Sequence, residues 1–261
     1  MTEPKLKDRV ALITGAGRGI GRAISLGFAR EGSSIAATAR TEHELDSLVR
    51  EITTLGQKAI AIPADLARPT AAGEIVRRVL EAFGTLDILV NNAGVGSSGS
   101  PRPLADFDDA FWDLSLAVNL TSPYLLCKAV LPTLLSKGKG RIINIASIAS
   151  KIGLIHGVAY AASKHGLLGL TRTLALEVAE AGITVNAICP GPVRTAMQEK
   201  RLAHDAKRLG VTAANLEKSL TPIGRRLEAE EIVPLAVLLA SDGSAAITGQ
   251  AFNICGGMVM F

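Results

Sequence analysis

The sequence has few aromatic residues, few cysteines and no histidine cluster. Only 3% of the 261 residues are aromatic, so Ala, Val, Leu and Ile must fill the core, as in parallel sheets covered by helices on both faces. The three cysteines, Cys127, Cys189 and Cys255, show no Cys-x-x-Cys spacing, which predicts reduced thiols in a cytoplasmic protein. The four histidines also lack metal-ligand spacing, so we expect no metal site.

The sequence also lacks a strong charge bias. The net charge is +4, and Lys and Arg are scattered along the chain, whereas a nucleic-acid site needs a dense basic stripe with aromatic residues. No N-terminal stretch has the pattern of a signal peptide, and no continuous uncharged run is typical of a membrane span. We therefore expect neither nucleic acid nor membrane as a partner.

Short β-rich runs alternate with longer helical stretches along the chain. The predicted strands are residues 9–14, 34–38, 59–63, 87–90, 141–145, 184–188 and 250–254, and the predicted helices are 19–30, 42–55, 70–83, 108–135, 160–180 and 228–241. The long helix 108–135 is expected to be interrupted or bent near Pro123. Repeated βαβ units predict an α/β fold in which residues 1–261 form a single domain, a Rossmann-type doubly wound parallel sheet of about seven strands with helices on both faces.

Residues 195–221 do not follow this alternation and are predicted to form an inserted helical flap. Apolar residues alternate there with five basic residues: Lys200, Arg201, Lys207, Arg208 and Lys218. An amphipathic helix covering a pocket explains the pattern without a special ligand. The alternative is that the basic side meets a phosphate-bearing acyl carrier or coenzyme A.

The first predicted strand leads into a glycine-rich loop, Thr14-Gly15-Ala16-Gly17-Arg18-Gly19-Ile20-Gly21. The glycines permit a tight turn, and the following helix can direct its first amides toward a diphosphate. The position between a first strand and a first helix favours a dinucleotide site over an ordinary turn.

The end of the second predicted strand bears on the choice between NAD and NADP. It carries Arg40 and no carboxylate, and Arg18 could reach the same place, so two guanidiniums are available for a 2′-phosphate. The alternative is that both are ordinary surface charges. Glu42 could bind a ribose, but residues 41–44 match a capping box that would already account for the acidic side chains. The pattern favours NADP.

Asp65 follows the third predicted strand, just before Leu66. Its carboxylate could accept a hydrogen bond from an adenine amino group, or it could cap the next helix. The residues alone leave both readings open.

Tyr160 and Lys164 are four residues apart on a predicted helix and so lie on one face. A phenol is a weak acid at neutral pH, and a nearby ammonium would lower its pKa. Ser147, just after a predicted strand, could hydrogen-bond a substrate oxygen. Such a trio can deliver a proton to an oxygen as hydride reaches the neighbouring carbon, or remove that proton in the reverse direction.

Together these motifs resemble the short-chain dehydrogenase/reductase family over nearly the whole length. The matching pieces are residues 14–21, Asn91-Asn92-Ala93-Gly94, Asn119, Ser147, Tyr160 to Lys164 and Pro190-Gly191. Residues 186–191 and 253–257 resemble bacterial β-ketoacyl and polyketide ketoreductases, although Cys255 departs from a common Asp-Gly-Gly ending.

The resemblance implies roles for individual residues. Tyr160 would be the acid/base, Ser147 would orient the carbonyl, Lys164 would bind the nicotinamide ribose, and Asn119 would hold a water of a proton relay. The remaining residues expected at the cofactor are Gly15, Arg18, Gly19, Ile20, Gly21, Arg40, Asp65, Leu66, Asn92, Ala93, Gly94, Pro190, Gly191, Val193 and Thr195, the last of which would bond the nicotinamide carboxamide.

The substrate and the assembly are less defined. The pocket is expected between residues 95–103, 150–157 and the flap. The main hypothesis is NADPH-dependent reduction of a ketone, including a 3-oxoacyl thioester. The alternatives are an alcohol or sugar-alcohol dehydrogenase working oxidatively, and a nucleotide-binding regulator without turnover, although the latter would not need Asn119, Ser147, Tyr160 and Lys164 together.

The resemblance also implies a homotetramer, or a dimer, paired through helices 108–135 and 160–180 and the C-terminal segment.

Overall fold

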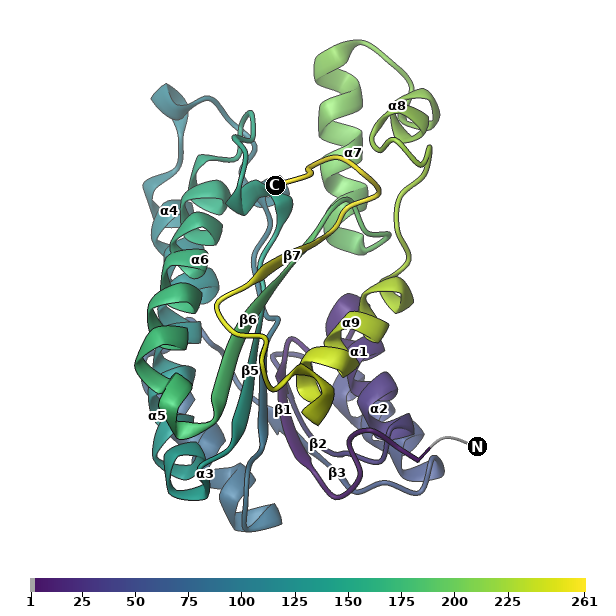
Figure 1. The fold of residues 1–261 in the computed structure, drawn as a ribbon. Coiled ribbons are helices and arrows are strands. Elements are labelled where there is room, and N and C mark those ends of the chain that lie inside the picture. Colours follow the sequence, from purple (N-terminus) through teal and green to yellow (C-terminus); the bar gives the residue numbers. More distant parts are fainter. Residues whose placement is uncertain (1–2) are drawn as a thin grey trace.

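The computed structural model describes residues 3–261 as a parallel sheet between two layers of helices (Figure 1). The sheet has seven strands in the order β3-β2-β1-β4-β5-β6-β7, and all neighbouring strands are parallel. The strands are β1 Val10–Thr14, β2 Ser34–Ala39, β3 Ala59–Pro63, β4 Ile88–Asn91, β5 Gly140–Ile145, β6 Ile183–Pro190 and β7 Ala251–Ile254. The predicted fold class is confirmed.

Each face of the sheet carries its own core, because side chains alternate along a strand. Ala11 and Ile13 of β1 belong to the core under the helices of one face, and Val10 and Leu12 belong to the core of the other. The first face is covered by α1 Gly19–Arg30, α2 Glu42–Thr54 and α9 Val233–Ala240, and the second by α3 Ala71–Phe83, α5 Ser122–Lys137 and α6 Val158–Val178 (Figure 1). Aliphatic residues therefore fill both layers, as the shortage of aromatics predicts.

Short helical turns complete the chain. They are the 3₁₀ turns η1 Ser97–Gly99, η2 Leu104–Asp106, η4 Ile148–Ser150, η5 Ala179–Ala181, η6 Ala229–Ile232 and η7 Asp242–Ser244. The sequence-based prediction placed one continuous helix at 228–241, where the structure has η6 followed by α9, with Pro234 in the first turn of α9.

The long helix predicted over 108–135 consists of three parts: α4 Asp109–Leu116, a π-helical turn η3 Ala117–Thr121, and α5. The predicted interruption near Pro123 is confirmed, because the π-helical turn ends two residues before Pro123. The residues before Pro123 are helical, and a proline there has no N–H to donate to the carbonyl of Asn119 one turn earlier. The irregularity lies one turn earlier and contains Asn119. π-helical turns of this kind are frequent at functional sites.

The stretch Asp109–Lys137 is long and apolar enough to cross a membrane, with a mean hydropathy of 1.4 and 39% of its most apolar window buried. The sequence-based expectation of no such stretch is therefore corrected. A helix that covers the core of a globular protein meets the same criterion, and α5 contributes Leu126, Val130 and Leu134 to the core beneath the sheet.

The flap is a pair of helices, α7 Ala196–Leu209 and α8 Ala213–Ser219, beyond the carboxyl edge of the sheet (Figure 1). Gly210, with φ +67°, ends α7 and turns the chain toward α8. At the base of the flap Val193 and Leu227 form a parallel bridge, supported by hydrogen bonds from Arg194 N–H to the Leu227 carbonyl (2.8 Å) and from Leu227 N–H to the Pro192 carbonyl (2.9 Å).

Candidate active site

The predicted site residues follow the carboxyl ends of several strands and therefore gather at one edge of the sheet. The glycine loop follows β1, Asn92 follows β4, Ser147 follows β5 and Gly191 follows β6. The strand order reverses between β1 and β4. In open α/β sheets such a reversal leaves a crevice at this edge, and ligands bind there.

The glycine loop has the backbone that its sequence predicts. Gly15 (φ +63°) and Gly19 (φ +55°) are both left-handed, a conformation that favours glycine. A Cβ at Gly21 would collide with the Gly15 carbonyl, so the helix must approach the loop closely. α1 begins at Gly19 with no side-chain cap and no acidic residue in its first turn. Its first amides are thus available for a diphosphate, and the loop fits the expected cofactor.

Asn92 and Thr14 support the back of this loop. The Asn92 side-chain amide donates to the carbonyls of Thr14 (2.8 Å) and Gly15 (3.2 Å), and the Thr14 hydroxyl accepts from the N–H groups of Asn92 and Ala93 (both 2.9 Å). These bonds join the ends of β1 and β4 across the reversal point. They make Asn92 a residue that shapes the cofactor cradle, whether or not it touches a ligand.

Arg18 and Arg40 lie near the end of β2, but their surroundings differ. The Arg18 side chain is 71% exposed and pairs with Glu44 at 3.6 Å. Arg40 is exposed, and within residues 3–261 it forms no ion pair. The predicted capping box is wrong, because Thr41 makes no side-chain cap bond and Glu44 lies against Gly17 and Arg18. Arg40 is therefore the freer guanidinium for a phosphate.

Asp65 does not cap α3, whose N-terminal residue is Thr70. One carboxylate oxygen of Asp65 accepts from the Ala67 N–H at 3.0 Å, while the side chain stays exposed and Leu66 is buried beneath it. The turn leaves the other carboxylate oxygen free for a ligand, so the cap reading is excluded and the adenine reading remains a prediction.

Ser147, Tyr160 and Lys164 come together as predicted. Ser147 N-caps the turn η4, where its hydroxyl accepts from the Ala149 N–H at 3.1 Å. It also hydrogen-bonds Tyr160. The Lys164 ammonium lies 5.9 Å from the centroid of the Tyr160 ring and donates to the Ile145 carbonyl at 2.7 Å. An ammonium has three donors, so Lys164 keeps donors for a further partner.

The pKa of Tyr160 differs from the prediction that the Lys164 ammonium would lower it. Burial raises the pKa of Tyr160 above its ordinary value, and the hydrogen bond from Ser147 opposes that rise. Burial also lowers the pKa of Lys164 to about 8. Proximity on the helix therefore does not by itself lower the pKa of the tyrosine, because desolvation of both groups outweighs the attraction of a charge beyond the ring.

Asn119 is fully buried at 0% exposure, and its side chain already has three partners. Its oxygen accepts from Val95 N–H (2.8 Å), and its amide donates to the Val95 carbonyl and to the Ser163 hydroxyl (both 3.0 Å). The side chain thus fixes the loop after β4 to α6, one turn from Tyr160. A water in a proton relay would have to use the backbone of the π-helical turn.

The segment after β6 reaches the same edge. The Thr195 hydroxyl accepts from Gln198 N–H at 3.3 Å and caps α7, and its expected bond to the nicotinamide carboxamide stays a prediction. Val193 is buried, and Gly191 packs against the backbone of Cys255. A Cβ at Gly19 would lie 3.2 Å from the Thr195 methyl, so the start of the flap touches the glycine loop.

One prediction about the pocket walls is corrected. Arg201, grouped with the exposed basic face of the flap, is only 7% exposed. Within the wall expected at 150–157, His156 is half-buried, and its Nδ1 lies 3.3 Å from Nε2 of His204 on α7. The flap thus carries fewer free charges than the sequence indicates, which weakens the case for a phosphate-bearing carrier.

The sequence-based reading missed a chain of buried amides below the site. The Asn91 amide donates to the Asn144 side-chain oxygen (2.9 Å), and the Asn144 amide donates to the Thr171 hydroxyl (2.8 Å). Asn91 and Asn144 face each other in the β4–β5 register. An asparagine within an otherwise apolar strand indicates a buried polar contact. Its partner, however, depends on the register between β4 and β5, which the sequence does not show.

Other chemistry-bearing residues have structural surroundings. All three cysteines are buried; burial raises the pKa of Cys127 to about 12, and Cys255 packs at the end of β7 against Val259. Within residues 3–261 no three His, Cys, Asp or Glu residues gather as a metal site would require.

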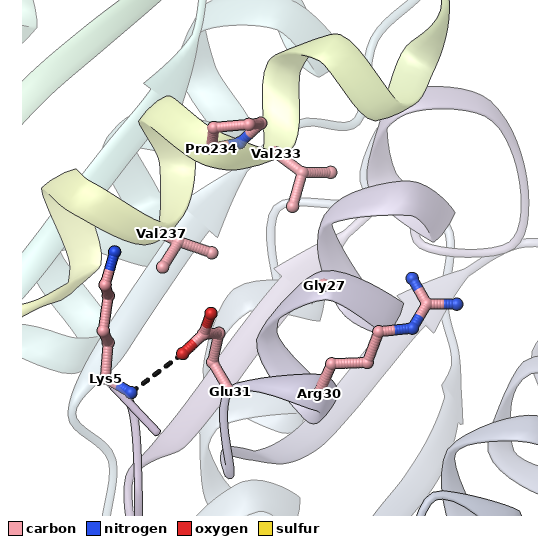
Figure 2. Close-up of a pocket in the computed structure, with 7 residues that line it drawn as sticks. All are labelled: Lys5, Gly27, Arg30, Glu31, Val233, Pro234 and Val237. Atoms are coloured by element: carbon pink, nitrogen blue, oxygen red, sulfur yellow. Dashed lines mark hydrogen bonds between the residues drawn. The ribbon is translucent and has the colours of Figure 1, made fainter. Parts of the chain in front are cut away.

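A cavity of about 300 Å³ between α1 and α9 (Figure 2) is lined by Lys5, Gly27, Arg30, Glu31, Val233, Pro234 and Val237. It adjoins the C-terminal end of α1, at the opposite edge of the sheet from Tyr160.

Comparison with known proteins identifies the class. Residues 9–206 match the short chain dehydrogenase family, and the chain belongs to that family. It is therefore an oxidoreductase acting on CH–OH or C=O groups. Among curated proteins, it is 42% identical over 254 residues to a protein of Streptomyces violaceoruber named as ketoacyl reductase 1 of the granaticin polyketide synthase, covering 95% of this chain and 92% of the relative.

Solved structures agree on the fold. A variant of actinorhodin polyketide ketoreductase with NADPH is 36% identical with a TM-score of 0.92, over 97% of this chain and 98% of the other. NAD⁺-bound xylitol dehydrogenase is 32% identical with a TM-score of 0.91, over 97% of this chain and 100% of the other. Both nicotinamide cofactors thus occur among similar folds, so likeness alone does not choose between them.

Proposed function

We propose that this protein is an NADPH-dependent ketoreductase that converts a ketone to a secondary alcohol. The observation that carries the proposal is the partly buried Tyr160 beside Ser147, with the Lys164 ammonium 5.9 Å from the centroid of its ring. The likeness to named ketoacyl reductases supports the direction of the reaction. We propose that residues 1–261 act as one cofactor-binding domain of a cytoplasmic protein.

The reaction needs a hydride and a proton. Bound NADPH supplies the hydride to the carbonyl carbon. Ser147 donates a hydrogen bond to the substrate oxygen and orients it, and Tyr160 transfers its proton to that oxygen as negative charge develops there. The pKa of Tyr160 is raised by burial, so the phenol holds its proton at neutral pH and is available as the donor in this step.

Lys164 and Asn119 support the proton transfer in this proposal. The Lys164 ammonium, with donors left over from its bond to Ile145, would bind the nicotinamide ribose and favour the tyrosinate left after each transfer. Asn119 holds the loop after β4 against α6. Its backbone in the π-helical turn would bind the relay water.

The preference for NADP rests on Arg40. It is exposed at the end of β2, where no carboxylate competes for a ribose hydroxyl. A 2′-phosphate would gain a bidentate partner there, with Arg18 nearby if its pairing with Glu44 opens. The other proposed cofactor contacts are the glycine loop, Asp65 to Leu66, Asn92 to Gly94 and residues 190–195.

The second candidate function is oxidation of a secondary alcohol or sugar alcohol. Likeness to xylitol dehydrogenase favours it. The same residues would serve, with Tyr160 accepting the proton in that direction. We propose reduction first because of the likeness to named ketoacyl reductases.

We further propose a homotetramer, or a dimer, paired through α4–α5 and α6. A groove of about 250 Å³ between α5 and α6 is lined by apolar side chains that include Leu131, Leu170 and Leu174. Sedimentation velocity tests this assembly directly.

The experiment that tests the function is a substrate panel followed by nicotinamide absorbance. The purified chain is given NADPH with simple ketones, β-keto thioesters and ketoses, and NADP⁺ or NAD⁺ with the matching alcohols. We expect reduction of ketones or β-keto thioesters with NADPH to have the highest kcat/KM. Turnover confined to polyols with NAD⁺ would establish the second candidate instead.

A further inference from the structure

An acidic residue of α2, Glu44, lies directly against the glycine loop that follows β1. A Cβ added to Gly17 would lie 2.7 Å from the Glu44 carboxylate oxygen Oε2 and 2.9 Å from the Glu44 Cβ. Interiors are close-packed, and neither distance leaves room for another atom. The Glu44 side chain therefore fills the space that any larger residue at position 17 would need, and it is still 24% exposed on the cofactor side of the loop.

Gly17 differs from Gly15 and Gly19 in the reason for being glycine. Gly15 and Gly19 have positive φ angles, which glycine adopts without strain, whereas the φ of Gly17 lies outside that region. The backbone at Gly17 therefore does not need glycine, but the approach of Glu44 does. The Glu44 Cβ is fixed to the helix and cannot rotate away from a methyl group, so the loop and the glutamate fit each other as a pair.

Glu44 also binds the guanidinium of Arg18, which stands just before the first residue of α1. The Arg18 Nη1 lies 3.6 Å from the Glu44 Oε1, and the Arg18 side chain is 71% exposed. An ion pair so close to water contributes little to stability. A ligand phosphate can therefore replace the carboxylate as the partner of Arg18 without disturbing the fold.

Other contacts hold α1 and α2 together without Glu44. One turn further along α1, Arg22 pairs with Glu51 at 2.7 Å, and Glu51 lies two turns further along α2. The apolar face of α2, which includes Leu45 and Leu48, is fully buried in the core. Attachment of the helix therefore does not explain why a carboxylate lies against the glycine loop.

The carboxylate affects NADPH and NADH differently. In the proposed site the 2′-phosphate of NADPH lies between Arg40 and Arg18. Its oxygens then compete with Glu44 for the Arg18 guanidinium, and the two anions repel each other. The ribose 2′-hydroxyl of NADH is neutral and meets neither effect, and a carboxylate can even accept a hydrogen bond from it.

We propose that Glu44 is a cofactor-specificity residue, which competes with the 2′-phosphate of NADPH for Arg18 and so reduces the preference for NADPH over NADH. Arg40 and Glu44 then act in opposite directions on the same phosphate, since Arg40 attracts it and Glu44 repels it. The position of that phosphate rests on the proposed function. The role of Glu44 goes beyond it, because this residue belongs to α2 and not to the end of β2, where the choice of cofactor is usually decided.

The first test is the dissociation constant of each cofactor for Glu44→Gln, measured by fluorescence titration without a ketone. Gln keeps the size of the side chain and removes its charge. We expect NADPH to bind about fivefold to tenfold more tightly, because Arg18 becomes free for the phosphate, and NADH to change by less than about twofold. Glu51→Gln is the matched control, because it removes the same charge from an ion pair between the same two helices.

Two outcomes of this titration overturn the proposal. One is the same NADPH dissociation constant in Glu44→Gln and Glu51→Gln. The other is weaker NADPH binding in Glu44→Gln, which would mean that Glu44 orients Arg18 for the phosphate. The nucleotides 2′,5′-ADP and 5′-AMP locate the effect, since only the first carries a 2′-phosphate. Glu44→Gln should tighten 2′,5′-ADP alone, and an equal gain for 5′-AMP contradicts the proposal.

Arg18→Met separates competition for the guanidinium from simple repulsion. In that background Glu44→Gln should tighten NADPH by no more than about twofold, because the group for which the two anions compete is gone. The full gain in both backgrounds would overturn the competition for Arg18.

The proposed function and the role of Glu44 can fail separately. If NADPH binds and ketones are reduced, but Glu44→Gln behaves like Glu51→Gln, only the role of Glu44 fails. If no ketone is reduced, the proposed function fails, while the titrations still decide the role of Glu44. A purely structural Glu44 would lower the melting temperature and weaken both cofactors together in Glu44→Gln, and that result also contradicts the proposal.

Discussion

The scaffold, by which we mean the sheet and the helices that cover it, differs from the flap, residues 195–221, in most of its buried polar groups. On the scaffold, neutral amides and hydroxyls bond one another at 2.8–3.0 Å, as in Asn91–Asn144–Thr171 and Asn119–Ser163. The scaffold also buries two charged side chains, Lys164 and Arg141. On the flap, the buried polar groups are guanidiniums paired with carboxylates that remain partly exposed, such as Arg226 with Glu199.

This difference matches what each region must do. A neutral network inside an apolar core is costly to break, because each separated group stays buried without a partner. An ion pair near the protein surface can separate at a small cost in free energy, because water then hydrates both charges. The scaffold therefore fixes atoms that must not move during proton transfer, while the flap is held by bonds that can reform.

The largest expected effect comes from the scaffold hydroxyl that transfers the proton. Tyr160→Phe keeps the ring but removes the proton donor, so kcat should fall by about 10³-fold or more, with NADPH binding retained. Tyr124, the other tyrosine of the chain, is 46% exposed on α5, and Tyr124→Phe is the matched control. Stopped-flow absorbance measures turnover, and tryptophan quenching by NADPH measures binding. Substantial activity in Tyr160→Phe would falsify the proposed acid role.

The next effect tests the charge at the end of β2. Arg40→Asp should shift the ratio of kcat/KM for NADPH over NADH by about 10²-fold toward NADH, because a bidentate partner of the phosphate becomes a repelling carboxylate. Arg50→Asp makes the same charge change on the exposed side of α2, eight residues after Glu42, the first residue of that helix. Initial rates with both cofactors give the ratio. A starting protein that already prefers NADH contradicts the assignment.

The neutral network gives the largest effect on stability. Asn144→Ala leaves Asn91 and Thr171 without their partner in the core and should cost about 2–4 kcal/mol of unfolding free energy. The matched control is Asn215→Ala, the same deletion at an exposed position of the flap, which should be near neutral. Urea denaturation followed by circular dichroism measures both. A cost at Asn144 no larger than at Asn215 would break the contrast between scaffold and flap.

The two regions also differed in how far the sequence could predict them. The helix spacing of Tyr160 and Lys164 and the glycine loop were predicted correctly, since both depend on residues close in sequence. Asn144 was not found, because its partner is set by the register between β4 and β5.

Arg201 was misplaced for a related reason. Its spacing to Asp205 is that of an ordinary surface pair, and only the docking of α7 on Ser97 and Ile155 buries it. The π-helical turn at Asn119, in contrast, has a local signal. Pro123 lies four residues later and cannot donate to the Asn119 carbonyl, so the proline predicted an interruption there, although not its π-helical form.

The pH dependence tests the electrostatics of the scaffold site. The pKa of Lys164 is lowered to about 8, so its ammonium is present below that pH and is lost above it. Ketone reduction should therefore be flat from pH 6 to 7.5, with kcat/KM falling up to tenfold per pH unit above about 8. Lys164→Met should remove this fall in kcat/KM at high pH, together with most of the activity. A profile that rises through pH 8 in the reducing direction contradicts the assignment.

The same shift predicts how stability depends on pH. Lys164 binds its proton less tightly when folded than at its ordinary value of 10.5. Between pH 8 and 10.5 the unfolded chain therefore holds more protons at this site, and its contribution to stability rises with pH. Relative to the starting protein, Lys164→Met should gain stability at pH 7 and lose that advantage toward pH 10. Thermal unfolding at the two pH values measures the difference.

The smallest effect is expected from the flap network. Glu217→Gln weakens the pairs with Arg194 and Arg226, yet the melting temperature should change by less than about 2 °C, because partly exposed ion pairs contribute little to global stability. Exchange in α8 should nevertheless increase, since no residue of that helix is buried and the pairs are its main attachment. Raising the salt concentration should mimic the substitution in the starting protein and have little further effect in the variant. A melting temperature as strongly lowered as in Asn144→Ala would mean that the flap is part of the cooperative core, and the division between the scaffold and a separately stabilised flap would then fail.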